Sequence, residues 1–338
     1  MSVLVTGGAG YIGSHVVRLL QERGEDVVVV DDLSNGKPER VGNAVLETFD
    51  LSDADATVKL GALMLKHEVD AVIHFAALKQ IGESMERPLW YYKANVEGMR
   101  HLIGAMQDAG VKTMVFSSSA GTYGQPDVDM ITEKTPCQPI NPYGQTKLIG
   151  EWMLDNAARF GMNSIKLRYF NVAGAGAPEL RDTAMMNLVP IVYNRLLAGQ
   201  DVVINGDDYP TPDGTCVRDY VHVVDLAEAH LVALDRLRGI RSGTAEPLAQ
   251  TVFNAGNGIG YSVREVIDAI SPVIGRTLDP VVGPRREGDP PRLVADASAI
   301  TEVLGWKASR TLEDMVRSAC PPELLAGHRG EKDGDVEQ

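Results

Sequence analysis

The fold of this chain is decided by residues 3–13, which read Val3-Leu4-Val5-Thr6-Gly7-Gly8-Ala9-Gly10-Tyr11-Ile12-Gly13. The apolar run at residues 3–5 predicts a strand, and the pattern from Ile12 to Gln21 predicts a helix. Between them, Gly7, Gly10 and Gly13 have the spacing G-x-x-G-x-x-G. Glycines at that spacing let a backbone turn sharply and approach a pyrophosphate, which the first N–H groups of the next helix would bind. The stretch predicts a dinucleotide cradle, with an ordinary glycine-rich turn as the alternative.

The alternation of strand and helix continues through the first half of the chain. Further strand-like apolar runs are Val27–Val30, Ala71–Phe75, Met114–Phe116 and Ile165–Leu167. Helical patterns separate most of them, which is typical of βαβ units that build a parallel sheet. After about residue 170 the pattern becomes irregular and rich in Gly and Pro. A helix at 225–237 and a strand at 252–254 then return to the sheet.

We therefore predict an α/β fold, with a Rossmann-type doubly wound parallel sheet and a smaller, irregular α/β lobe that binds the substrate. The nucleotide-binding domain would take residues 1–172, with return segments near 217–257. The lobe would take residues 173–216 and 258–320. Residues 321–338 are charged and contain Gly, and we predict a disordered tail there.

Composition limits the partners of the protein. The chain has 338 residues and a formal net charge of −14, which argues against nucleic acid and against an anionic membrane surface. No apolar stretch approaches the ~20 residues that span a bilayer, and no signal peptide is visible. The three cysteines, Cys137, Cys216 and Cys320, fit neither a zinc site nor a disulfide framework. We expect a cytoplasmic protein with reduced thiols and no metal site.

Carboxylates follow the second and third predicted strands. Asp31 ends the second strand, where it can accept hydrogen bonds from the hydroxyls of an adenosine ribose and would repel a 2′-phosphate. Asp32 follows it in place of an Arg, and the pair favours NAD over NADP. An exposed loop aspartate without a role is the alternative. Asp50 follows the apolar stretch 46–49, and it could either face the adenine or cap a helix ahead of Leu51.

A second motif predicts the chemistry. Tyr143 and Lys147 are four residues apart, on one face of a helix that opens at Pro142. An ordinary tyrosine has a pKa of about 10, so a base at neutral pH needs positive charge nearby. The Lys147 ammonium and an oxidised nicotinamide could supply that charge. Ser119 follows the strand at 114–116 and could hydrogen-bond the reacting hydroxyl.

The chain resembles the extended short-chain dehydrogenase/reductase family from Ser2 to about Thr311, and within it the branch that epimerises UDP-hexoses at C4. The glycine stretch and Tyr143 to Lys147 are typical of the superfamily. The following stretches are more specific: His74-Phe-Ala-Ala-Leu-Lys79 with Gly82-Glu-Ser84, Ser117-Ser-Ser-Ala120, Arg168-Tyr-Phe-Asn171, Asp208-Tyr-Pro210, Asp213-Gly214, Val217-Arg-Asp-Tyr220 and Arg285-Arg-Glu-Gly-Asp289.

The resemblance implies reversible, NAD-dependent 4-epimerisation of a UDP-hexose, UDP-glucose or UDP-galactose, through a 4-keto sugar. Tyr143 would be the base at the sugar 4-hydroxyl, Lys147 would lower its pKa and hold the nicotinamide ribose, and Ser119 would hydrogen-bond the sugar oxygen. The residues expected to bind the cofactor are Gly7, Gly10, Tyr11, Ile12, Gly13, Asp31, Asn35, Asp50, Leu51, Phe75, Ala76, Lys79, Asn95, Tyr143, Lys147 and Phe170.

The resemblance also assigns a UDP-sugar site. Arg218 and Arg286 would hold the diphosphate and Asp289 the uridine ribose, although each Arg alone is an ordinary surface residue. The full set expected to bind the substrate is Ser119, Tyr143, Asn171, Asn187, Leu188, Arg218, Arg286, Asp289 and Leu293. Leu293 occupies the position that gates the sugar 2-substituent, which leaves acceptance of UDP-GlcNAc open. The resemblance further suggests a homodimer packed through helices of the first lobe.

Two rival functions follow from the same residues. Dehydratases with the same fold need an acidic pair directly after the serine position, whereas this chain has Ala120 and Gly121 there. Another UDP-sugar, such as UDP-GlcNAc, a UDP-uronate or a UDP-pentose, stays open as substrate. The other class is a non-catalytic nucleotide-sugar sensor, which usually loses the Tyr or the Lys of the helix motif; both are present here.

Overall fold

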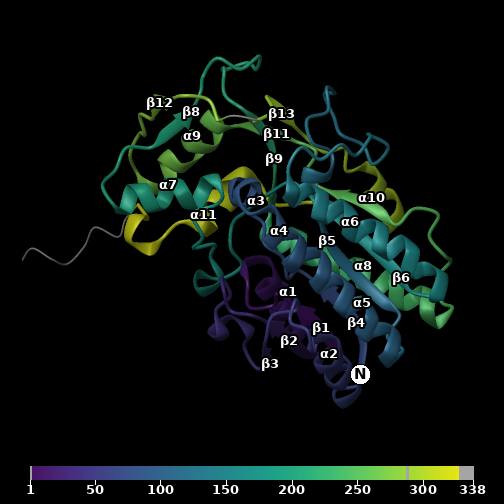
Figure 1. Ribbon diagram of the computed structural model, residues 1–338. Helices are drawn as coiled ribbons and strands as arrows, with labels where there is room; N and C mark the ends of the chain where they lie inside the picture. Colours follow the sequence, from purple (N-terminus) through teal and green to yellow (C-terminus); the bar gives the residue numbers. More distant parts are fainter. Residues whose placement is uncertain (1, 287–288, 327–338) are drawn as a thin grey trace, which may run out of the picture.

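The computed structural model describes residues 2–286 and 289–326, and its centre is a seven-stranded sheet (Figure 1). The strands lie in the order β10-β6-β5-β4-β1-β2-β3, and every pair is parallel. They are β1 Ser2–Thr6, β2 Asp26–Asp31, β3 Val45–Thr48, β4 Val69–His74, β5 Thr113–Ser119, β6 Asn163–Tyr169 and β10 Val252–Ala255. This arrangement confirms the predicted Rossmann-type fold.

Helices cover both faces of this sheet because successive strand residues point to opposite sides. Val3 and Val5 belong to a core cluster with α1 (Tyr11–Glu22) and α8 (Val223–Ser242), whereas Leu4 packs on the other face. The helices of that second face are α2 (Ala56–Lys66), α5 (Gly98–Ala109) and α6 (Pro142–Ala157). Burial on both faces explains why β1, β2 and β4 in the centre of the sheet have long apolar runs.

The chain order makes the carboxyl ends of β1 and β4 a topological switch point, where open α/β sheets have a crevice. From β1 the chain runs outward through β2 to β3, and it then returns to β4 on the other side of β1. The helices that follow these two neighbouring strands, α1 and α5, therefore lie on opposite faces of the sheet. In open α/β sheets, ligands bind at such a switch point.

A smaller lobe follows, built on two small sheets. One has the order β11-β9-β13, with β7 also paired to β9, and the other pairs β12 with β8. Its strands are β7 Asn171–Ala173, β8 Val203–Asn205, β9 Val217–His222, β11 Gly260–Ser262, β12 Val281–Gly283 and β13 Arg292–Leu293. Its helices are α7 Leu188–Leu197, α9 Val263–Ile274 and α11 Leu312–Ala319, and these three share a separate core cluster. The smaller α/β lobe is thus confirmed.

Short helical segments complete the described chain. They are α3 Ile81–Glu86, α4 Pro88–Tyr91, α10 Ser298–Leu304, a π-helical turn η2 Tyr92–Glu97, and the 3₁₀ turns η1 Pro38–Val41, η3 Ala120–Thr122, η4 Ala158–Phe160, η5 Pro178–Leu180 and η6 Pro322–Leu324. No helix in the part of the chain that the structure describes is long and apolar enough to cross a membrane.

Two of the predicted boundaries look different in the structure. β10 and α8 return to the large sheet, but β9, the first part of the return segment near 217–257, pairs with β7, β11 and β13. It joins the smaller sheet because β7 follows β6 immediately and offers it a parallel edge. Of the predicted tail 321–338, residues from 327 onward lie outside the described residues. Its first part forms η6, and the Ala326 N–H donates to the Val273 carbonyl at 3.0 Å.

Candidate active site

The glycine loop after β1 is a cradle with no space for side chains. Gly7 has a φ of +70° and its N–H donates to the Val30 carbonyl at 2.8 Å, which turns the chain away from β1. A Cβ atom on Gly13 would lie 2.2 Å from the Gly7 oxygen. A Cβ atom on Gly7 would lie 2.6 Å from the Ala76 nitrogen, in the loop after β4. The structure therefore brings the loops of the two strands at the switch point into contact.

The N-terminus of α1 is open toward this cradle. The helix begins at Tyr11, its N-cap is Gly10, and neither a side-chain cap nor an acidic residue stands in its first turn. The N–H groups of Tyr11, Ile12 and Gly13 have no intrahelical acceptor because they belong to that turn. Such an end attracts an anionic group such as a pyrophosphate. The cradle thus fits the predicted dinucleotide by its shape and its free donors.

Asp31 lies where the sequence predicts it, beside the glycine loop. Its carboxylate accepts hydrogen bonds from the Ala9 N–H at 3.0 Å and from the Leu33 N–H at 2.9 Å. Burial raises its pKa, and these two hydrogen bonds oppose the rise. Each carboxylate oxygen has a second lone pair, so Asp31 can still accept from ribose hydroxyls.

The other residues expected near the adenosine have mixed surroundings. Asn35 is exposed, in the loop that follows β2. Asp50 accepts from the Ser52 N–H at 2.7 Å, in a tight turn, while Leu51 is buried. α2 begins only at Ala56 with Asp55 as N-cap, so the interpretation of Asp50 as a helix cap ahead of Leu51 is wrong. The chain makes a side-chain-to-backbone turn there first.

The loop after β4 forms the second wall of the crevice. The N–H groups of Phe75 and Ala76 both donate to the Thr6 carbonyl, at 2.9 and 3.1 Å. Buried Asn95 holds the next part of this loop, because its amide oxygen accepts from the Leu78 N–H at 2.8 Å and its amide nitrogen donates to the Leu78 carbonyl at 3.0 Å. Lys79 is exposed. The Asn95 amide nitrogen also donates to the Thr146 hydroxyl at 3.0 Å, which ties this loop to α6.

Tyr143 and Ser119 meet at the carboxyl edge of β5. Asn141 caps α6 by accepting from the Gly144 N–H at 2.8 Å, and this cap places Tyr143 in the first turn of the helix. Burial raises the pKa of the Tyr143 phenol, and a hydrogen bond with the Ser119 side chain opposes that rise. For the chain by itself, this direction is opposite to the lowering expected for a base.

Lys147 is a buried cation one turn further along α6. Its ammonium donates to the Ser117 carbonyl at 2.7 Å and lies 5.2 Å from the centre of the Phe116 ring. Its pKa is lowered to about 7, chiefly by burial and also by the charge of Lys79, while the charge of Glu151 opposes the lowering. Lys147 is thus held against β5, beside the serine segment, by a backbone carbonyl.

Behind this site lies a buried polar network that the sequence motifs did not identify. Glu151 accepts from Arg168 Nε at 2.8 Å and also from the Ser118 hydroxyl. The Arg168 guanidinium lies 4.8 Å from the centre of the Tyr123 ring. The spacing of Glu151, four residues after Lys147 on the same helix, was the signal that could have identified it.

The lobe brings three predicted residues toward the serine segment. Leu293 and Phe170 pack on a small cluster that contains buried Ala120 and Tyr123. Asn171 begins β7, directly after Phe170, and pairs in register with Tyr220 of β9. Leu293 of β13 pairs in register with Arg218 of β9. The pairing of β7, β9 and β13 therefore places Asn171, Arg218 and Leu293 in one sheet, and Leu293 packs beside the turn that follows Ser119.

Two of the residues predicted to bind the diphosphate and the uridine ribose pair with one another. Arg218 donates to Asp289 at 3.0 Å, so the residue expected to hold the diphosphate contacts the residue expected to hold the uridine ribose. Arg286 is exposed, whereas its neighbour Arg285 pairs with Asp208 and lies 4.2 Å from the centre of the Tyr209 ring.

The two remaining predicted residues lie at the start of α7. Asn187 is the N-cap residue of this helix, and its amide donates to Asp182 at 2.8 Å. Leu188, which is half-buried, packs on the core cluster of the lobe. Both therefore stand on the lobe, at the end of the segment that begins with Asn171.

Sheet and site together define a Rossmann-fold protein of the extended short-chain dehydrogenase/reductase class. Residues 3–256 match the family described as NAD dependent epimerase/dehydratase, and the chain belongs to that family.

Relatives match nearly the whole chain. The UDP-glucose 4-epimerase of Azospirillum brasilense is 45% identical over 324 residues, which cover 94% of this chain and 90% of the relative. That of Halalkalibacterium halodurans is 42% identical and covers 94% of each chain. The crystal structure of UDP-glucose 4-epimerase from Brucella ovis in complex with NAD has a TM-score of 0.88 and 40% identity, with 96% of this chain and 99% of that chain covered.

A further solved structure holds both kinds of ligand. The UDP-glucose 4-epimerase from Stenotrophomonas maltophila with bound NAD and formylated UDP-arabinopyranose has a TM-score of 0.86 and 43% identity, covering 94% of this chain and 96% of that chain.

Proposed function

We propose that this chain interconverts UDP-glucose and UDP-galactose by epimerisation at C4, with NAD as a cofactor that each turnover regenerates. The observation on which the proposal depends is the meeting of Tyr143, Ser119 and Lys147 at the carboxyl end of β5. Relatives at 42–45% identity over 94% of the chain are UDP-glucose 4-epimerases, which supports the same activity here.

Each of the three side chains has a role that its surroundings support. Tyr143 takes the proton of the sugar 4-hydroxyl and later returns it. Ser119 hydrogen-bonds the same sugar oxygen, because its hydroxyl already contacts the phenol. Lys147 provides positive charge and holds the nicotinamide ribose. NAD, when bound, accepts a hydride from C4 of the sugar and gives it back on the opposite face.

The cofactor is expected to complete the electrostatics of the site. Burial alone keeps Tyr143 protonated, since its pKa is raised in the chain by itself. A positively charged ring near the phenol favours the phenolate. Proton transfer from the sugar is therefore coupled to occupancy of the cradle.

Epimerisation is favoured over the related eliminations because acid–base groups are missing at the decisive positions. Ala120 and Gly121 follow Ser119, and neither side chain can move a proton at C5 or C6 of a sugar. A Cβ atom on Gly121 would lie 3.3 Å from Ser119 Oγ and 3.6 Å from Tyr143 Cε1. The 4-keto sugar would therefore meet only the groups that reduce it again.

The substrate is held, in this proposal, between the lobes. Arg218 and Arg286 bind the diphosphate and Asp289 binds the uridine ribose, which requires the Arg218–Asp289 contact to rearrange or to be shared with the ligand. Asn171, Asn187 and Leu188 contact the substrate from β7 and from the start of α7. Leu293 lies near the sugar, and a panel of UDP-hexoses, UDP-HexNAcs and UDP-uronates followed by NMR determines which sugar is preferred.

The base assignment is tested with Tyr143→Phe. We expect this variant to lose epimerisation of UDP-galactose by about a thousandfold or more, while it retains NAD in the amount bound by the wild type. Tyr193→Phe is the control, because the Tyr193 phenol donates to the Val316 carbonyl in the core of the lobe. Near-normal turnover by Tyr143→Phe would contradict the assignment. Absence of turnover in the wild type, with UDP-sugar still bound, would favour the sensor function.

We also infer a cytoplasmic homodimer. The family resemblance supports this inference, because it suggests a dimer packed through helices of the first lobe. Light scattering of the purified protein determines the mass of the particle.

A further inference from the structure

Three successive residues after β7 are anchored by side chains from two distant parts of the chain. The Tyr11 phenol donates to the Gly174 carbonyl at 2.6 Å. The Ala175 N–H donates to the Ser318 hydroxyl at 3.1 Å, and the Gly176 N–H donates to His15 Nε2 at 2.9 Å. Residues 174–176 are therefore fixed on one side to α1 and on the other to α11.

The His15 imidazole uses both nitrogens, and its tautomer follows from its partners. His15 is 2% exposed, and its Nδ1 lies 2.8 Å from the Tyr11 carbonyl, which can only accept. Nδ1 therefore bears the hydrogen, and Nε2 is left as the acceptor for the Gly176 N–H. Burial lowers the pKa of His15 to about 4, so this neutral form persists at neutral pH. Protonation of Nε2 would place its N–H against the Gly176 N–H, and the hydrogen bond between them would be lost.

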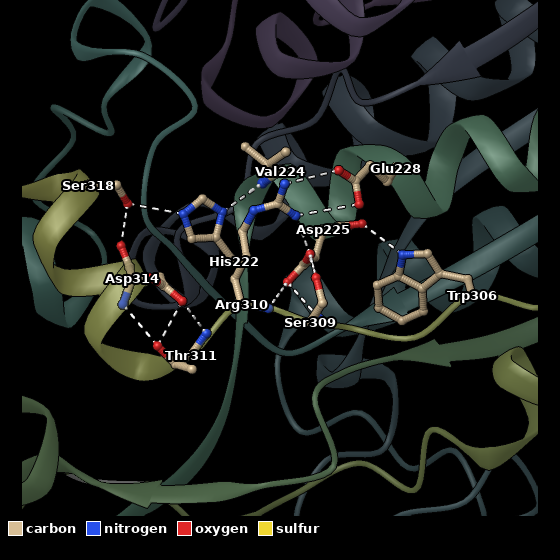
Figure 2. A network of polar contacts seen from close by, with 10 residues as sticks. All are labelled: His222, Val224, Asp225, Glu228, Trp306, Ser309, Arg310, Thr311, Asp314 and Ser318. Carbon is tan, nitrogen blue, oxygen red and sulfur yellow. Dashed lines mark hydrogen bonds and ion pairs between the residues drawn. The ribbon is translucent and has the colours of Figure 1, made fainter.

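His222 has the opposite tautomer, which follows from its contacts with Val224 and Ser318 (Figure 2). Its Nδ1 accepts from the Val224 N–H at 3.1 Å, so Nε2 bears the hydrogen and donates to Ser318 at 3.0 Å. The Ser318 hydroxyl gives its own hydrogen to the Asp314 carbonyl at 2.6 Å. Ser318 is thus oriented to accept from Ala175.

Both imidazole rings lie directly on the segment's backbone. A Cβ atom on Gly174, whose φ is +90°, would lie 2.5 Å from His222 Nε2. One on Gly176 would lie 3.0 Å from His15 Cδ2. The glycines allow this approach, and the rings leave the backbone no room to shift toward them. Hydrogen bonds and steric contact therefore hold the backbone of residues 174–176, and we call this arrangement of Tyr11, His15, His222 and Ser318 around the segment the clamp.

The clamp connects the two halves of the proposed site. Tyr11 is the first residue of α1, and its backbone N–H faces the cradle. Segment 174–176 follows Asn171 and precedes Asn187 and Leu188, which the proposed function assigns to the substrate. We propose that His15 is a positioning residue that sets the place of the substrate segment 171–188 relative to the dinucleotide cradle. This inference rests on the proposed function for the identity of the ligand.

Two substitutions separate the nitrogens of His15. In His15→Asn, the amide nitrogen replaces Nδ1 and still donates to the Tyr11 carbonyl, but the side chain is too short to reach Gly176. In His15→Gln, the amide oxygen reaches the place of Nε2 and accepts from Gly176. His67→Asn is the matched control, because His67 lies at the C-terminal end of α2 and its described contact with Ser2 uses only the backbone carbonyl.

We expect His15→Asn to raise the KM for UDP-galactose and the Kd for UDP, measured by calorimetry, about three- to tenfold, which is the effect of one lost hydrogen bond. Exchange of the Gly176 amide hydrogen should become about tenfold faster, while bound NAD stays at the wild-type amount. His15→Gln should restore all three values, and His67→Asn should leave them unchanged.

The outcomes are separable. Equal values for His15→Asn and the wild type overturn the inference, and so does equal impairment of the Asn and Gln variants, which would indicate a purely structural histidine. If His15→Asn does not fold, Ser318→Ala removes the neighbouring anchor of Ala175, and an unchanged Kd for UDP there overturns the inference. An inactive wild type would contradict the proposed function, while amide exchange and UDP binding would still decide whether the clamp acts.

Discussion

Among single residues, Asp219 is the most completely buried carboxylate beside the proposed substrate site. It is 0% exposed, and its oxygens accept from the N–H groups of Asn257, Gly258 and Ala295, at 2.8, 2.9 and 3.2 Å. These bonds tie β9 to the loop after β10 and to the end of β13. Because Arg218 and Leu293 are the neighbours on β9 and β13, Asp219 holds two predicted substrate residues in one sheet.

A pH dependence of stability follows from this carboxyl. Burial raises its pKa from 3.8 to about 6 although three N–H groups oppose the rise. The folded state therefore binds the proton more tightly than the unfolded state, so the contribution of Asp219 to stability is largest below about pH 4 and is lost as the pH rises to 6. We expect the free energy of unfolding of the wild type, relative to Asp219→Asn, to fall by about 2 kcal/mol between pH 4 and pH 7.

Urea denaturation of both proteins at the two pH values measures this difference. Subtracting the variant removes the titration of the other groups that both proteins share. A difference that is independent of pH would mean that the carboxyl is ionised throughout, with its three hydrogen bonds outweighing the cost of burial.

At the scale of elements, α6 is attached to the sheet by charge as well as by apolar packing. Glu151 on α6 and Arg168 on β6 are 3% and 5% exposed. They form an ion pair that joins the helix to the large sheet. Removing one partner of a buried ion pair leaves the other charge buried without a partner, which lowers stability. Replacing both partners with apolar groups often leaves the free energy of unfolding unchanged. The same carboxylate raises the pKa of Lys147. Stability and the charge of the active site therefore depend on one residue.

Glu151→Gln is expected to lower the free energy of unfolding by about 3–5 kcal/mol. The double variant Glu151→Leu with Arg168→Met should recover most of that loss, as measured by urea denaturation. Without the Glu151 charge, the pKa of Lys147 falls below its present value of about 7. The kcat of Glu151→Gln should therefore decline at a lower pH than that of the wild type, and a single variant as stable as the wild type would contradict the argument.

The elements differ in how far the sequence predicts them. Strands β1, β2, β4, β5, β6 and β10 are predicted because each is buried on both faces and so is continuously apolar. The glycine loop and Asp31 are predicted because their spacing from a strand is local. The Arg218–Asp289 contact and the bond from Gly176 to His15 join residues far apart in the chain. No local sequence pattern predicts these two contacts. The turn at Asp50 has the same side-chain hydrogen bond as a helix cap, and it differs because the chain after it does not continue as a helix until Ala56.

In the whole molecule, the cradle belongs to the large sheet, whereas most of the residues proposed to bind the UDP-sugar lie on the smaller lobe. The Tyr11 phenol crosses from one to the other at Gly174. A cofactor in the cradle contacts a crevice whose walls are the loops after β1 and β4, which are joined to each other by hydrogen bonds to Thr6. Such a preformed crevice requires little rearrangement to bind, which favours tight retention.

We expect the purified protein to retain NAD or NADH through gel filtration. Regeneration in each turnover removes any need for release, and the rigid crevice walls slow it. Denaturation of the filtered protein followed by chromatography of the released nucleotide measures the bound fraction. Complete loss of nucleotide in a single passage would argue for a cofactor that leaves after each reaction.

The position of β10 in the sheet has a consequence for biosynthesis. Residues 252–255 complete the sheet beside β6, but the ribosome must first make all of α7, β9 and α8. During that interval the nascent chain exposes the backbone donors and acceptors of β6 to solvent. Unpaired edge strands of this kind template aggregation. Chaperone dependence should therefore be greatest for chains that stop short of residue 255, and it should drop once Phe253 and its neighbours have been synthesised.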